Sequence, residues 1–205
     1  IRCTTPIYDL EVRSTGNYVY PYIHYDLSCH DLTIAQGKFG VNQTHVNVSG
    51  QLNIHGILQM IHATDTLDVT GSINWHSGST DNITSGAIIA GLDWHFKSGT
   101  TANLGTGNTV FVKSPPFYIV PLVNDWNDDA AFGTLVIDQQ GAGSSKVYPT
   151  HDTIRVNGNL SVNANNIVRM NQGKLRVRGD LIMDPTSSFA EFTAAGLLVV
   201  DGNLD

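Results

Sequence analysis

The sequence predicts an all-β protein, a parallel β-helix with about 21 residues per coil and roughly nine coils. Two observations lead to this prediction. Charged residues make up only 14% of the chain, and the polar residues are mainly Asn, Thr, Ser and Gly, which favour strands and turns over helices. In addition, a short alternating phrase recurs at a nearly constant interval, which is typical of a solenoid of stacked coils.

The recurring phrase is an alternating strand, a turn that usually contains glycine, and a second strand that begins with Leu or Ile. These first residues of the second strand are Leu52, Ile73, Leu92, Leu160, Leu181 and Leu204, with weaker copies at Leu10 and Leu32. Most steps lie between 19 and 23 residues, but 68 residues separate Leu92 from Leu160. That gap leaves room for three coils with an insertion, and strands are expected there at 108–112 and 133–137.

Two other folds share part of this pattern. A leucine-rich repeat has a similar period, but its LxxLxLxxN signature is absent. A β-sandwich has short strands at regular spacing but does not keep one phrase in one phase along the whole chain. We therefore expect a single β-solenoid domain over 1–205, with a loop excursion at 113–130, where three prolines interrupt the strand pattern.

Alternation within each strand separates inward from outward side chains. If the first residue of the second strand points inward, Trp75 and Trp94 stack one coil apart in the core. The outward positions then form two columns, one of Asn53, Asn74 and Asp93 and one of His55, His76 and His95.

Two groups of side chains suggest metal ligands. The imidazoles of the His column are candidate ligands for a transition metal, although three ligands in a row suit a tetrahedral ion poorly. The alternative is a solvated ladder, which like-charge repulsion disfavours at low pH. The segment NDWNDDAAFG holds Asp125, Asp128 and Asp129, whose oxygens suit Ca²⁺; the alternative is a solvated acidic loop. No other cofactor is expected.

The segment KSPPFYIVPLVNDW, residues 113–126, contains the aromatic residues Phe117, Tyr118 and Trp126. Aromatic side chains on a loop of a rigid scaffold are suited to stack on a sugar, and the alternative is a hydrophobic flap over the core. Many parallel β-helices degrade polysaccharides, a reaction that needs converging carboxylates. No outward column is expected to hold two or three acidic residues in register, which argues against catalysis.

Charge and cysteine content limit the partners. The net charge of −7 argues against nucleic acid and anionic membranes, which attract basic proteins. No apolar run reaches the roughly 18 residues of a membrane-spanning helix, so no membrane insertion is expected. Cys3 and Cys29 form a disulfide if the chain is secreted, or remain two buried thiols.

The phrases FGTLVID, IRVNGNLSVNANN, GKLRVRGDLIMD and LLVVDGNLD resemble the NLTI…LTVNGNLTI…G repeats of large secreted surface proteins of Bacteroidetes-like bacteria. Many of those proteins are exported by the type IX route. The resemblance covers most of the chain, best over 132–205, and implies an extracellular adhesin, stalk or fibre module at the bacterial cell surface. The motifs DTL and DTI also resemble sites that such bacteria O-glycosylate, which implies modification of Thr66 and Thr153.

The sequence therefore predicts a non-catalytic structural or adhesive module. Its expected partners are further coils of the same protein or identical subunits in a fibre, together with surface glycans. The chain stops within a repeat at VDGNLD, so we expect its last coil to be open, with unpaired strand edges. The alternative is a carbohydrate-binding or polysaccharide-degrading β-helix with its site near 113–130.

Overall fold

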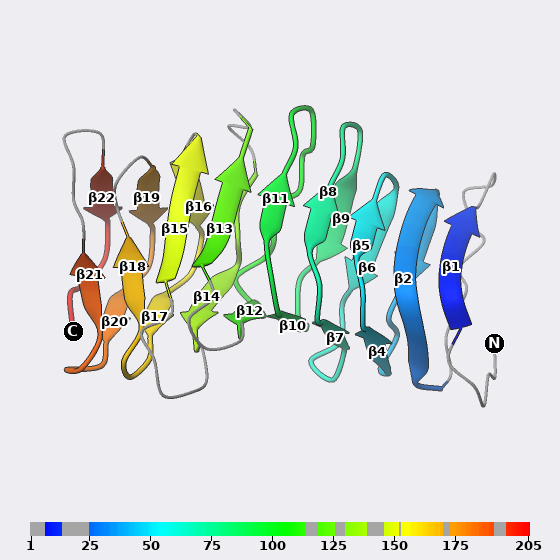
Figure 1. Ribbon diagram of the computed structural model, residues 1–205, viewed down its shortest axis with the longest axis horizontal. Helices are drawn as coiled ribbons and strands as arrows, with labels where there is room; N and C mark the ends of the chain where they lie inside the picture. The colour runs from blue at the N-terminus through cyan, green and yellow to red at the C-terminus, as the bar shows by residue number, and fades with distance from the viewer. Residues whose placement is uncertain are drawn as a thin grey trace.

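The computed structural model describes residues 7–13, 25–113, 119–125, 130–138, 146–151, 153–169, 173–190 and 196–205. Within these ranges every regular element is a β-strand, and no helix is present that could cross a membrane. The strands are parallel to their neighbours and stack along one axis, with the two ends of the chain at opposite ends of the stack (Figure 1). The prediction of an all-β parallel β-helix is confirmed.

Each coil contributes up to three strands, and the strands of successive coils form three faces. Face 1 consists of β4 (His45–Val48), β7 (Thr66–Val69), β10 (Gly86–Ala90), β12 (Asn108–Val112), β14 (Thr134–Ile137), β17 (Leu160–Val162) and β20 (Leu181–Met183). Face 2 consists of β5 (Leu52–Ile54), β8 (Ile73–Trp75), β11 (Trp94–Phe96), β13 (Ile119–Asn124), β15 (Lys146–His151), β18 (Ile167–Arg169) and β21 (Ser188–Ala190). Face 3 consists of two separate three-stranded sheets, β3 (Lys38–Gly40), β6 (Ile57–Met60) and β9 (Thr80–Ile83) in one, and β16 (Thr153–Val156), β19 (Lys174–Val177) and β22 (Leu197–Val200) in the other.

The first two strands join faces 1 and 2. The strand β2 (Leu27–Gln36) is long enough to pair with β4 through its first residues and with β5 through its later ones. The strand β1 (Ile7–Arg13) lies along β2, with Leu10 opposite Leu32. The two weak copies of the repeat are therefore in register, as the sequence predicts.

The solenoid has about seven turns rather than the roughly nine expected. The strands expected at 108–112 and 133–137 are present as β12 and β14. These two strands fill the interval before β17 on face 1, where three coils were expected. Val110 pairs with Leu135, and Leu135 pairs with Leu160, so more residues separate register partners here than elsewhere on this face. Fewer and longer coils thus occupy the middle of the chain.

The recurring phrase turns two different corners. In VNVSGQLNI and LDVTGSINW it joins face 1 to face 2, whereas in IRVNGNLSV and LRVRGDLIM it joins face 3 to face 1. The expectation that the phrase keeps one phase is therefore wrong. Glycine explains why both corners use it: a Cβ at Gly71 would collide with the backbone oxygen of Gly50, and a Cβ at Gly179 would lie 2.7 Å from the backbone of Gly158. Successive corners stack too closely for a side chain.

The core lies inside the coils, and its largest members are aromatic. Trp75 and Trp94 are both fully buried, as expected. They are not register partners, however, because Trp94 pairs with Ile73 and Phe96 pairs with Trp75. The two indole rings are 6.4 Å apart and tilted by 33°. The predicted stack is wrong because Leu92 precedes the strand, so β11 enters the core two residues later than the repeat suggests.

The segment 113–130, expected to be a loop excursion, contains a strand of face 2. Residues 119–124 form β13, which pairs with β11 on one side and β15 on the other. Residues 114–118 and 126–129 lie outside the described residues.

Pro121 and Pro149 both lie within strands of face 2, although the prolines of 113–126 were expected to keep that segment out of the strands. β11 pairs with β13 only from Leu122 onward, so Pro121 has a described partner on the β15 side alone. Among the described residues, β18 pairs with β15 only at Lys146 and Val147, so Pro149 is likewise paired only with β13. A proline is tolerated where a strand has one neighbour, as on a sheet edge.

Candidate functional site

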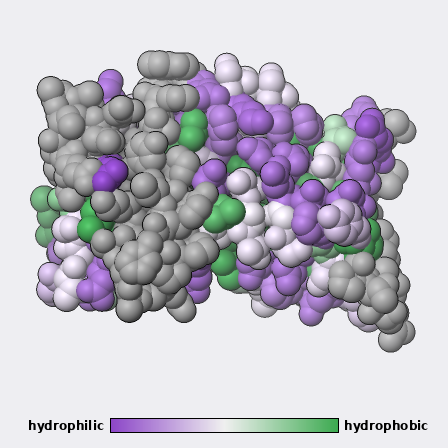
Figure 2. All heavy atoms as spheres, in the orientation of Figure 1, coloured by the Kyte–Doolittle hydropathy of each residue, from purple (hydrophilic) through white to green (hydrophobic). Residues whose placement is uncertain are grey.

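Face 2 carries a group of outward polar side chains on β5, β8 and β11 and directly after β5, β8, β11 and β13. We call this group the Asn-His strip, and its members are Asn53, His55, Asn74, His76, His95, Lys97 and Asp125. Figure 2 views this face and shows hydrophilic residues gathered over these strands. The strip contains the asparagines and histidines of the two predicted columns and one of the three predicted Ca²⁺ ligands, Asp125.

The register places His95 in a different column from the one predicted. His95 lies opposite Asn74, and Asn74 lies opposite Asn53, so His95 continues the asparagine column. Asp93, the predicted third member of that column, lies before β11 begins. The same two-residue shift that separates the indoles causes this correction.

Lys97 is the residue that continues the column of His55 and His76. Its backbone N–H donates to Trp75 O, just as the N–H of His76 donates to Ile54 O in the coil before. Lys97 was not among the residues predicted from the sequence. The signal was present, because Phe96 and Trp75 are both inward aromatic residues, and aligning them places Lys97 in the column of His76.

His55 and His76 stack on each other, with ring centroids 4.0 Å apart and planes 18° apart. His76 Nε2 lies 3.3 Å from Asn53 Oδ1, which also accepts a hydrogen bond from Asn74 Nδ2 at 3.3 Å. Burial, followed by the charges of His55 and Lys97, lowers the pKa of His76 to about 4. The lone pairs of stacked rings lie in nearly parallel planes and do not converge, so this geometry gives no support to a metal ion shared by the column.

His95 contacts Asp125 at the end of the strip. His95 Nε2 and Asp125 Oδ2 are 2.6 Å apart, a distance at which the ring N–H donates to the carboxylate, and both side chains are about a quarter exposed. Asp125 is one of the three predicted Ca²⁺ ligands; Asp128 and Asp129 lie outside the described residues. The Ca²⁺ site stays a prediction, and Asp125 has at least one competing partner.

The predicted sugar-stacking residues Phe117, Tyr118 and Trp126 also lie outside the described residues. Cys29 is buried, and burial raises the pKa of its thiol to about 11. Its proposed disulfide partner, Cys3, lies outside the described residues, so that pairing stays a prediction.

The predicted glycosylation sites, Thr66 and Thr153, are the first residues of β7 and β16, and both side chains are partly exposed. In the DTL motif the acidic residue is Asp65, which is 1% exposed. Its carboxylate accepts hydrogen bonds from the backbone N–H groups of Gln43, Ile61 and His62, at 2.5, 2.8 and 3.0 Å. Asp65 therefore closes a turn in the folded chain. Modification of both threonines stays a prediction.

The chemistry of the strip is that of a hydrogen-bonding surface. No family model, curated protein or solved structure matches the chain. The function of the strip is therefore inferred from its geometry alone. Amide and imidazole groups donate to and accept from hydroxyl-rich ligands, whereas Asp125 is the only carboxylate of the strip, and glycoside hydrolysis ordinarily uses two.

Proposed function

We propose that the chain is a non-catalytic structural or adhesive β-solenoid module of an extracellular bacterial surface protein or fibre. The observation that carries this proposal is a contrast between the last two coils on face 3. Leu175 and Val177 of β19 are 2% and 0% exposed, whereas their register partners in β22, Leu198 and Val200, are only partly buried. A strand stacked on β22 buries these side chains as β22 buries those of β19.

The outward side of the same end supports association as well. Large apolar side chains are exposed there, and they are Ile182, Leu197, Val199 and Leu204. Unpaired strand edges together with exposed apolar side chains favour pairing with another strand. That strand belongs either to further coils of the same protein or to an identical subunit in a fibre. The composition and the resemblance to bacterial surface repeats support the extracellular location.

Sedimentation velocity and negative-stain electron microscopy over a range of protein concentrations test this proposal. We expect association into rods longer than one solenoid. Leu198→Lys places a charge on the stacking surface and abolishes the association. Val136→Lys places the same charge on an outward side chain of β14, in the middle of the solenoid, and serves as the matched control. Monodisperse short rods of the unaltered protein at every concentration would overturn the proposal.

The Asn-His strip favours a second candidate function, binding of a glycan along face 2. Asn53 and Asn74 offer amide groups, and Asp125 places the strip next to the segment 113–130, where the alternative interpretation puts its site. A glycan array with the unaltered protein and with an Asn53→Ala/Asn74→Ala variant tests this candidate. Polysaccharide cleavage that Asp125→Asn abolishes would replace both candidates with an enzyme.

A further inference from the structure

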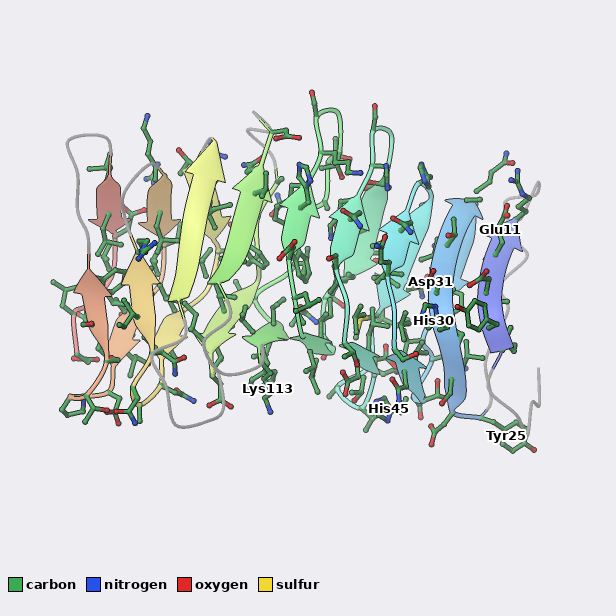
Figure 3. All side chains as sticks on the ribbon, viewed as in Figure 1. Glu11, Tyr25, His30, Asp31, His45 and Lys113 are labelled. Carbon is green, nitrogen blue, oxygen red and sulfur yellow. The ribbon has the colours of Figure 1, made fainter. Side chains whose placement is uncertain are left out.

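A second cluster of polar side chains lies away from the strip, where β2 turns from face 1 to face 2. Asp9 of β1 lies directly opposite Asp31 of β2, next to His30. Among the described residues, these are the only three candidate ligands whose donor atoms all lie within 4.8 Å of one another. No outward column with two acidic residues in register was expected from the sequence, and the Asp9–Asp31 pair shows that this expectation is wrong. Figure 3 labels His30 and Asp31 at the middle of β2.

The corner gives both side chains room. His30 and Asp31 stand between the buried residues Cys29 and Leu32, so the corner consists of two consecutive residues that are not inward. In the next coil Gly50 occupies the position beneath them. A Cβ there would collide with Asp31 Oδ1 and come within 2.9 Å of His30 Cε1. The side chains of His30 and Asp31 thus fill the space that a side chain at position 50 would need.

Contacts with neighbouring coils hold the cluster in place. The ring of Tyr8 stacks on the ring of His30, with centroids 4.6 Å apart and planes 2° apart. The backbone N–H of Gln51 donates to Asp31 Oδ1 at 2.7 Å. Ligands that are oriented by surrounding contacts before an ion arrives lose less entropy when they bind it.

The cluster is electrostatically incomplete. Like charges directly opposite in a ladder are destabilising, and Asp9 and Asp31 form such a pair. His30 Nδ1 lies 3.2 Å from Asp31 Oδ1 but is not aligned for a hydrogen bond, and this covered nitrogen has no other hydrogen-bond partner.

We propose that Asp9, His30 and Asp31 form a binding site for a divalent transition-metal ion, with Zn²⁺ as the best match. One imidazole nitrogen and two carboxylate oxygens are a mixed ligand set that suits Zn²⁺. Zn²⁺ bonds of about 2.0–2.1 Å place neighbouring tetrahedral ligands about 3.3 Å apart, close to the 3.2 Å between His30 Nδ1 and Asp31 Oδ1. The ion neutralises the carboxylate pair and cross-links β1 to β2. This site is independent of the function proposed above.

Titration calorimetry with Zn²⁺ on chelator-treated protein tests the site, and Mn²⁺ is the second probe. We expect one equivalent of Zn²⁺ to bind. Asp9→Asn and His30→Gln each weaken binding at least tenfold, because each removes a ligand. His45→Gln is the matched control, because His45 is an exposed histidine of β4 that lies outside the cluster. Substitution with Co²⁺ adds a readout of coordination, since its visible absorption appears in the unaltered protein and is lost in Asp9→Asn.

Thermal unfolding distinguishes a metal ligand from a merely structural residue, because the substitution of a ligand changes the unfolding midpoint differently with and without Zn²⁺. In chelator, Asp9→Asn raises the midpoint because it removes the repulsion between the carboxylates. In Zn²⁺, the unaltered protein gains stability and the variant does not. The difference between the two unfolding midpoints therefore becomes smaller or changes sign. Asp31→Asn keeps an acceptor for the Gln51 N–H and serves if Asp9→Asn does not fold. The proposal is overturned if neither ion binds the unaltered protein saturably, or if the ligand variants bind Zn²⁺ as it does.

Discussion

His76 stacks on His55 in the neighbouring coil, with ring centroids 4.0 Å apart, and this pair accommodates added positive charge poorly. Burial and the charges of His55, Lys97 and His95 lower the pKa of His76 from 6.5 to about 4. Between these two pH values the unfolded chain binds a proton at this residue that the folded chain does not. The contribution of His76 to the free energy of unfolding is therefore fully present above about pH 6.5, and it is lost as the pH is lowered toward 4.

We expect the free energy of unfolding to fall by about 1–2 kcal/mol over that window, less than the full pKa shift implies because solvent screens the partly exposed ring. Urea titrations at a series of pH values measure this loss. His76→Gln removes the titrating group and flattens the dependence. His45→Gln, at an exposed position of β4 that Figure 3 labels, leaves the dependence in place. An unchanged pH profile in His76→Gln would contradict the assignment.

The stacked corner between faces 1 and 2 requires glycine. A Cβ at Gly71 would collide with the backbone oxygen of Gly50, which cannot move as the end of a flexible side chain can. We expect Gly71→Ala to destabilise the protein by about 2–4 kcal/mol through backbone displacement in two coils. Gly40→Ala is the matched control, because no atom lies within 4 Å of a Cβ there. Equal unfolding midpoints for the two variants in urea would show that the corners do not stack this closely.

Asp65 stabilises the fold through three backbone hydrogen bonds from Gln43, Ile61 and His62. Asp65→Ala leaves these donors without their acceptor, and we expect a cost of about 2–4 kcal/mol in chemical denaturation. Asp68→Ala removes an outward carboxylate of the adjoining strand β7 and is expected to change stability by less than about 0.5 kcal/mol. If the two variants are equally stable, the buried carboxylate does not organise this turn.

The sequence predicted the period and the fold class because both depend on alternation and glycine spacing, which are local. It did not predict the register of every coil. A corner that is longer by two residues shifts the register of the next strand, but it leaves the alternation of inward and outward residues intact. Leu52 and Ile73 are inward and paired as predicted, whereas Leu92 is only partly buried and lies outside the strand. The length of the corner at Gly91 is fixed by its stacking on Thr70, a contact between coils that no local pattern reports.

The same reasoning explains what was missed and what was within reach. Leu10 and Leu32 were recognised as equivalent, and Asp9 and Asp31 each precede one of them. The pairing of the two carboxylates could therefore have been predicted by aligning the coils residue by residue. The contribution of His30 was not within reach, because a two-residue corner, in which consecutive side chains both avoid the core, breaks the period-2 rule that assigns directions.

The register of β11 itself is open to a direct test with two substitutions. Trp94 is fully buried and contacts Phe132 with ring centroids 4.8 Å apart, so Trp94→Ala leaves a large cavity and is expected to cost about 3–5 kcal/mol. Leu92 is only partly buried, so Leu92→Ala is expected to cost clearly less, about 1 kcal/mol.

Trp94→Phe distinguishes lost volume from lost polar contacts. Trp94 Nε1 is buried without a hydrogen-bond partner, so phenylalanine removes an unsatisfied donor while it retains most of the aromatic packing. We therefore expect Trp94→Phe to be much more stable than Trp94→Ala in guanidinium unfolding followed by circular dichroism. If Leu92→Ala proves as damaging as Trp94→Ala, then Leu92 enters the core, the strand begins two residues earlier, and His95 returns to the column of His55 and His76.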